Sequence, residues 1–155
     1  MPKKLKLDID FSSDITLIAV SCHKRDFWLA MQINEILKTD LRRMNDLPYY
    51  HPVANQLLNY PLFHHVDKDA GYSWFLIGNH NPEGKLFPEL KGSDFLVLLN
   101  AMLADDKRSE TIARFKKIKG VLTAFQADLN KIKDLKNFIS DLELHMVEEL
   151  KKKNS

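Results

Sequence analysis

Two carboxylates, Glu89 and Asp94, are the side chains whose types and spacing come nearest to a chemical site in this sequence. They flank Lys91-Gly92, and a tight turn there could bring them together. Paired carboxylates can serve as a general acid and base or hold one hard cation. The same residues also suit a structural role, in which Glu89 accepts turn amides and Asp94 fixes the turn. We favour the structural role and keep an enzyme or metal binder centred on Glu89 and Asp94 as an alternative.

The histidines do not add a metal site to this pair. His64 and His65 are adjacent, so on a strand they point to opposite faces and cannot both reach one metal ion. His23, His51 and His80 lie at none of the short spacings that zinc sites use. We therefore expect no metal and no cofactor.

Cys22 is the only cysteine of the chain. It follows an apolar stretch and precedes the basic residues His23-Lys24-Arg25, surroundings that could lower the pKa of a thiol. We favour a packing role, because free cysteines are among the most buried residues. A single cysteine cannot form an intramolecular disulfide, which favours a reducing, cytoplasmic location.

Alternating aromatic residues provide a second alternative function. Tyr72 and Trp74 would lie on one face of a strand, with Phe63 on the neighbouring strand. Aromatic side chains on an open sheet can stack the bases of single-stranded nucleic acid. However, the same alternation buries one face of a sheet under helices, and a net charge of +2 gives no basic footprint. We favour the core role, and nucleic-acid binding is not the expected function.

A stripe of apolar residues near the end of the chain suggests self-association. Leu142, Met146 and Leu150 share one face of a helix that is expected to begin near residue 140, after the capping box Ser140-Asp141-Leu142-Glu143. That face must dock either on its own domain or on a second copy. A second copy of the chain, forming a homodimer, is therefore the one partner for which the sequence gives a physical reason.

Length and composition predict one domain over residues 1–155, with a C-terminal helical extension from about residue 140. The sequence is 45% hydrophobic and 28% charged, as in ordinary globular proteins. Its longest apolar stretch, residues 95–104, is far shorter than the roughly 20 residues that cross a bilayer. Asp8 and Asp10 stand where a signal peptide would have its apolar segment, so export is not expected. A membrane span is not expected either.

The order of the expected elements predicts the fold. We expect an α+β protein with a mainly antiparallel sheet, helices on one face in a ferredoxin-like sandwich, and an extra C-terminal helix. Strands are expected at residues 15–21, 60–66, 72–80, 86–87, 95–99 and 121–127, and helices at 26–37 and 105–119. The runs at 60–66 and 72–80 should form a hairpin, and a second hairpin should close through Lys91-Gly92. Residues 40–59 should form a long connection with a short strand.

The stretch Phe87-Pro88-Glu89, three residues, then Ser93-Asp94-Phe95 resembles the signature of the IPExxxVDY family, small proteins of bacteria of the Bacteroidetes type. Pro88, Glu89 and Asp94 fit the signature, while its isoleucine, valine and tyrosine are replaced. Further segments occur in a similar order, so the resemblance covers roughly residues 3 to 137; these segments are Leu5–Asp8, Thr16–Ile18, Tyr60–Phe63 and Val121–Phe125. The resemblance implies no activity, substrate or catalytic residue.

These observations favour a non-catalytic, cytoplasmic interaction or dimerisation module, with a small ligand bound between subunits as a further option. The protein partner is not specified by the sequence. The two alternatives are the single-stranded nucleic-acid binder and the enzyme or metal binder described above.

Overall fold

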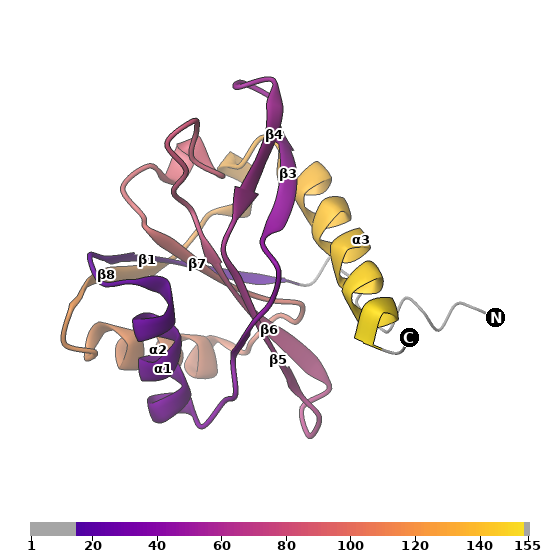
Figure 1. The fold of residues 1–155 in the computed structure, drawn as a ribbon. Helices are drawn as coiled ribbons and strands as arrows, with labels where there is room; N and C mark the ends of the chain where they lie inside the picture. The colour runs from indigo at the N-terminus through magenta and orange to yellow at the C-terminus, as the bar shows by residue number, and fades with distance from the viewer. Residues whose placement is uncertain (1–14, 154–155) are drawn as a thin grey trace.

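The computed structural model describes residues 15–153, and these form an α+β fold (Figure 1). The opening segment Leu5–Asp8 of the family resemblance lies outside the described residues. Within residues 15–153, six strands form one sheet in the order β2-β5-β6-β7-β1-β8, and a separate pair of strands forms the β3-β4 hairpin. Every strand pair is antiparallel, so the predicted α+β class is confirmed.

The centre of the sheet has the predicted ferredoxin-like order. Helix α1 follows β1, helix α2 connects β7 to β8, and the strands lie in the order β8-β1-β7-β6. Strand β5 extends this core beside β6, and the two-residue β2 forms the far edge. The strands are β1 (Thr16–Cys22), β2 (Arg42–Arg43), β5 (Leu62–Asp67), β6 (Tyr72–Gly78), β7 (Phe95–Leu99) and β8 (Val121–Gln126).

Helices α1 (Asp26–Leu37) and α2 (Asp105–Lys116) cover one face of the sheet. Leu29 and Ile33 of α1 and Phe115 of α2 are buried among side chains from β1, β6 and β7. Both helices begin where the sequence places them, and Gly120 beyond α2 adopts a φ of 114°, which a glycine tolerates. These two helices and the sheet enclose the first hydrophobic core.

The other face is covered by α3 (Leu135–Lys153) and by the hairpin of β3 (Leu47–His51) and β4 (Gln56–Tyr60). In Figure 1, the yellow α3 lies on the side of the sheet opposite α1 and α2. The expectation that the two helices between the strands share one face is confirmed, and α3 is the expected extra C-terminal helix, which covers the other face. Continuously apolar strands such as β7 are the physical reason, because a strand that is apolar on both faces needs cover on both.

Two predictions about local structure are corrected. Residues 40–59 contain the β3-β4 hairpin rather than a long connection with one short strand, and the hairpin turns through Asn55 at a φ of 57°. The hairpin expected through Lys91-Gly92 does not form, because Pro88–Leu90 is a 3₁₀ turn and β7 pairs instead with β6 and β1.

Helix α3 begins at Leu135, not near residue 140, so Ser140 lies inside the helix and does not cap it. Asp134, immediately before the helix, accepts hydrogen bonds from the side-chain amide of Asn137 and from the hydroxyl of Tyr49. A second short 3₁₀ turn, Leu129–Lys131, links β8 to this start. The expected C-terminal extension is therefore a helix that packs on the sheet.

Candidate functional site

Glu89 and Asp94 do not form a site together. Glu89 Oε2 accepts a hydrogen bond from the backbone amide of Lys133 at 3.2 Å, and Asp94 Oδ2 accepts one from the backbone amide of Cys22 at 2.8 Å. Each carboxylate thus ties the 3₁₀ loop to a different distant segment. This arrangement supports the structural role of Glu89 and Asp94. The expectation that both carboxylates bond within their own turn is wrong, because their partners are Lys133 and Cys22.

A buried asparagine that the sequence analysis missed organises the same loop. Asn79 is fully buried, donates its side-chain amide to the carbonyl oxygens of Leu90 and Ser93, and accepts from the backbone amide of Phe87 at 2.8 Å. Its position at the end of an apolar strand was the available signal. A buried amide needs several partners, and this loop supplies them.

The histidines lie in different parts of the described structure. In residues 15–153, no three His, Cys, Asp or Glu side chains come close enough to hold a metal ion. His64 stacks on Phe75 with ring centroids 4.9 Å apart, whereas His65 lies towards α1 and α2. The two side chains therefore do point to opposite faces of the sheet.

Cys22 has the packing role that was favoured for it. Its side chain is 2% exposed, and burial raises the pKa of the Cys22 thiol above its ordinary value. A nucleophilic cysteine needs a lowered pKa and access to substrate.

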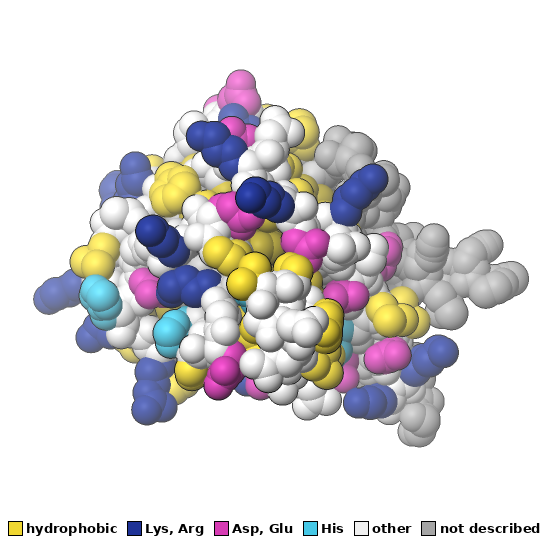
Figure 2. Space-filling model, turned by 90° about the horizontal axis from the view of Figure 1, so that it is seen from above, with side chains coloured by type: hydrophobic (Ala, Val, Ile, Leu, Met, Phe, Trp, Pro, Cys, Tyr) yellow, Lys and Arg dark blue, Asp and Glu magenta, His cyan; other side chains and the backbone are white. Residues whose placement is uncertain are grey.

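The aromatic face required for base stacking is covered. Phe63 and Trp74 are 4% and 6% exposed and belong to the core beneath α1 and α2. On the face seen in Figure 2, lysines and arginines lie among acidic and apolar side chains. These aromatic residues therefore cannot form the proposed stacking platform.

The self-association stripe on α3 is largely internal. Leu142 and Met146 are 0% and 1% exposed and pack against the sheet of their own domain. Leu150 is half-buried and lines a surface hollow between α3 and β5. Of the two docking alternatives for this stripe, the structure shows Leu142 and Met146 docked on their own domain, where a second copy cannot contact them, and self-association stays a prediction. No helix within residues 15–153 combines the length and apolarity needed to cross a membrane.

A cavity of about 270 Å³ lies beside Phe87-Pro88-Glu89, but the side chains of Tyr49, His51 and Glu89 that line it already have partners. The hydroxyl of Tyr49 donates to Asp134, and Glu89 accepts from Lys133. His51 accepts at Nδ1 from two backbone amides, and its Nε2 lies 2.8 Å from the carbonyl oxygen of Lys85. These side chains therefore need no ligand as a hydrogen-bond partner.

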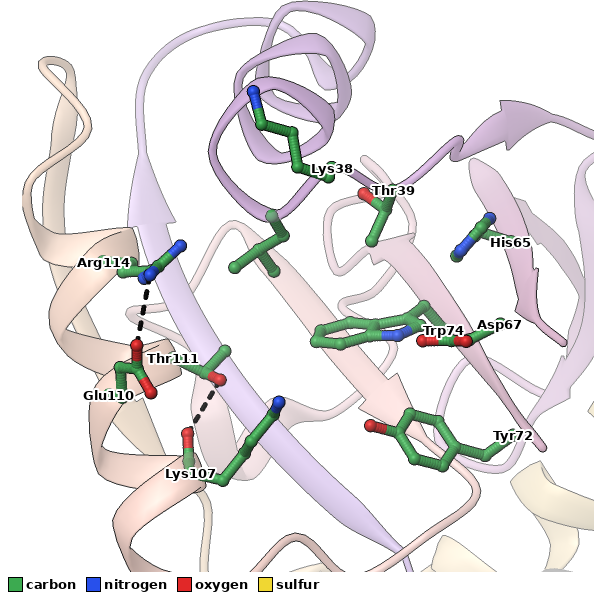
Figure 3. A pocket seen from close by; sticks show the side chains of 11 residues that line it. Lys38, Thr39, His65, Asp67, Tyr72, Trp74, Lys107, Glu110, Thr111 and Arg114 are labelled. Atoms are coloured by element: carbon green, nitrogen blue, oxygen red, sulfur yellow. Dashed lines mark hydrogen bonds and ion pairs between the residues drawn. The ribbon is translucent and has the colours of Figure 1, made fainter. Parts of the chain in front are cut away.

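A second cavity, of about 190 Å³, lies between the end of α1, strands β5 and β6, and α2 (Figure 3). We call it the Trp74 pocket. Trp74 lies across its middle, and Tyr72, two residues earlier on β6, lies beside it with ring centroids 6.4 Å apart. The complete lining is Leu37, Lys38, Thr39, His65, Asp67, Tyr72, Trp74, Lys107, Glu110, Thr111 and Arg114.

The α1 side of the Trp74 pocket is a braced turn. Lys38 ends α1 in the left-handed conformation, with φ 57° and ψ 41°. Asn34 accepts from the hydroxyl of Thr39 at 2.8 Å and from the backbone amide of Leu41 at 2.7 Å. The backbone amide of Asp40 donates to Nδ1 of His65 at 3.2 Å, which attaches the turn to β5.

Four polar residues of α2 form the opposite side. Lys107, Glu110, Thr111 and Arg114 have the i, i+3, i+4, i+7 spacing that places residues on one face of a helix. Arg114 donates to the carbonyl oxygen of Ile36 at 2.9 Å and pairs with Glu110 at 3.1 Å. The first of these contacts connects α2 directly to α1.

Trp74 carries the unusual feature of this pocket. Among residues 15–153, its Nε1 is the one buried side-chain nitrogen or oxygen without a hydrogen-bond partner. An indole N–H can only donate, and leaving it unsatisfied in the interior costs free energy. The pKa of the adjacent Tyr72 hydroxyl is raised by burial and by the charge of Asp67, which keeps that hydroxyl protonated.

The core role favoured for Trp74 is confirmed, but sequence reasoning did not predict that Tyr72 and Trp74 also line a cavity. The polar face of α2 was a readable signal. The position of that face opposite Trp74 was not readable, because the lining comes from three segments that are distant in sequence: the end of α1, the β5-β6 hairpin and α2.

Comparisons with known proteins do not assign a function. No protein-family model matches this sequence, and no curated protein matches it.

Proposed function

We propose that this protein is a non-catalytic module that binds a small molecule in the Trp74 pocket. The proposal rests on one observation: Nε1 of Trp74, beside that cavity, is buried and has no hydrogen-bond partner among the described residues. Native proteins leave few buried polar groups without a partner, so a buried, unpartnered donor beside a cavity favours a ligand that accepts its hydrogen bond. Membership of the IPExxxVDY family and a reducing, cytoplasmic location remain parts of the proposal, the latter supported by the single cysteine.

Binding rather than catalysis fits the groups around the pocket. Glu110 is paired with Arg114, and Asp67 Oδ1 accepts from the backbone amide of Ala70 at 2.9 Å. The volume of about 190 Å³ is below the roughly 300–1,000 Å³ of sites for drug-sized ligands, which favours a compact metabolite.

Native mass spectrometry of the protein purified gently from its own host tests this function. The expected result is an added small-molecule mass on the 18.0 kDa chain. Lys107→Trp places a large ring at the exposed rim and should remove the added mass, whereas Lys116→Trp, on the same helix outside the pocket, should retain it. A bare chain in both variants and in the original protein would contradict the proposal.

A homodimer is the second proposal, and β8 is the surface that favours it. β8 is the terminal strand of the sheet order, contains no charged residue, and exposes 59% of Leu122 and 45% of Phe125. Uncharged edge strands are templates for pairing with another chain. Phe125→Lys should convert a dimer to a monomer in light scattering, while Leu144→Lys, on the exposed side of α3, should not. A monomeric original protein would contradict this proposal.

A further inference from the structure

We infer that the ligand of the Trp74 pocket is a small organic or inorganic anion, held through a carboxylate or phosphate group. This inference rests on the proposed function, since it names the chemical class of the molecule bound there. It follows from which hydrogen-bonding groups of the pocket are already used and which remain open.

Three groups of the pocket are open donors. Trp74 Nε1 donates only. His65 accepts at Nδ1 from the backbone amide of Asp40, so the neutral ring carries its proton on Nε2, which becomes another donor. The hydroxyl of Tyr72 forms no hydrogen bond within the described part of the chain and is a further open donor.

The positive charges of the pocket are also incompletely matched. Within residues 15–153, neither Lys38 nor Lys107 forms an ion pair, whereas Arg114 is paired with Glu110. In Figure 3, the amine of Lys107 and the hydroxyl of Tyr72 point into the space beside the indole of Trp74. An anionic group placed there would receive charge-assisted hydrogen bonds, which are stronger than neutral ones.

The pocket also contains acceptors. The hydroxyls of Thr39 and Thr111 donate to Asn34 and to the carbonyl oxygen of Lys107, so they can only accept from a ligand. Asp67 and Glu110 are the carboxylates of the lining, and Lys38, Lys107 and Arg114 outnumber them, so the charge of the lining still favours an anion. Nε1 is buried in this structure, so the inference requires that a rim side chain such as Lys107 or Tyr72 moves aside when the anion binds.

The test follows the indole N–H signals in ¹⁵N–¹H spectra of the full chain. The sequence contains two tryptophans, Trp28 and Trp74, so Trp28→Phe assigns the signals. The probes are inorganic phosphate and acetate as anions, glycerol and acetamide as neutral molecules, and choline as a cation. We expect a saturable shift of the Trp74 signal with phosphate or acetate, no shift with the other probes, and an unmoved Trp28 signal. Which anion binds more tightly distinguishes a phosphate ligand from a carboxylate ligand.

Matched variants locate the binding site. Lys107→Gln should weaken anion binding by about tenfold or more, while Lys116→Gln should leave it unchanged. Asp67→Asn removes a negative charge from the lining and should strengthen anion binding about two- to fivefold. An equal effect of Lys107→Gln and Lys116→Gln would overturn the inference. A second result with Asp67→Ala would also overturn the inference. In that result, the substitution by itself moves the Trp74 signal as far as phosphate does, and phosphate then moves the signal no further. Asp67 would in that case be the hydrogen-bond partner of Trp74.

Other outcomes separate the inference from the proposed function. A saturable shift of Trp74 with glycerol, acetamide or choline but with neither anion would overturn the anion class while supporting a small-molecule pocket. No shift with any probe, together with no bound mass in the native spectra, would overturn both.

Discussion

The carboxylate of Asp94 accepts a hydrogen bond from the backbone amide of Cys22 at 2.8 Å, which fixes the start of β7 against the end of β1. Asp94→Ala should lower the free energy of unfolding by about 1–3 kcal/mol, because the amide of Cys22 loses its partner. Asp94→Asn keeps an accepting oxygen and should retain most of that stability. Urea denaturation measures both variants, and equal losses would contradict this role.

Trp74→Phe should leave the free energy of unfolding within about 1 kcal/mol of the original value. The substitution removes a buried donor that lacks a partner, and relief of that cost offsets the smaller apolar ring. The same variant should lose anion binding. Thermal unfolding and phosphate titration measure the two effects, and a large loss of stability without added ligand would contradict this expectation.

Leu142→Ala should destabilise the protein by about 2–5 kcal/mol, because Leu142 is fully buried between α3 and the sheet. Leu144 is 59% exposed on the same helix, so Leu144→Ala should change stability by less than about 0.5 kcal/mol. Chemical denaturation and light scattering should be recorded together. A change of mass in Leu142→Ala without loss of stability would restore the self-association role.

Alkaline pH should destabilise the fold through its buried tyrosines. Burial raises the pKa of Tyr60 to about 12, while an unfolded tyrosine titrates near 10. The unfolded state therefore releases its proton first, so the contribution of Tyr60 is complete below about pH 10 and is lost as the pH rises towards 12. Burial, followed by the hydrogen bond to Asp134, also raises the pKa of Tyr49. Tyr60→Phe should make the fall in unfolding free energy between pH 10 and 12 shallower, and an unchanged slope would contradict this assignment.

Local patterns were sufficient for most of the sheet and for two helices. The β5-β6 hairpin is readable because β-rich runs flank the turn residues Asp67 to Gly71, and α2 is readable from its acidic start and trailing basic residues. The β3-β4 hairpin was missed because Pro48 and Pro52 are typical strand breakers. Pro48 is tolerated in this separate two-stranded pair, where it lies opposite Asn59.

Long-range features could not be predicted from local patterns. Glu89 and Asp94 are close in sequence, but their partners, Lys133 and Cys22, lie in segments that only the tertiary fold brings near the loop. The apolar stripe of α3 predicted a docking face without specifying its partner. The Trp74 pocket likewise depends on how α1 and α2 meet over β6, which side-chain periodicity does not determine.

The most direct test of the central claim is the indole region of the ¹⁵N–¹H spectrum during titration with the low-molecular-weight fraction of an extract from the protein's own host. Small-molecule binding in the Trp74 pocket predicts that the Trp74 N–H signal moves saturably while the Trp28 signal stays in place, and that Lys107→Trp abolishes the movement. A Trp74 signal that stays fixed throughout the titration would contradict the claim.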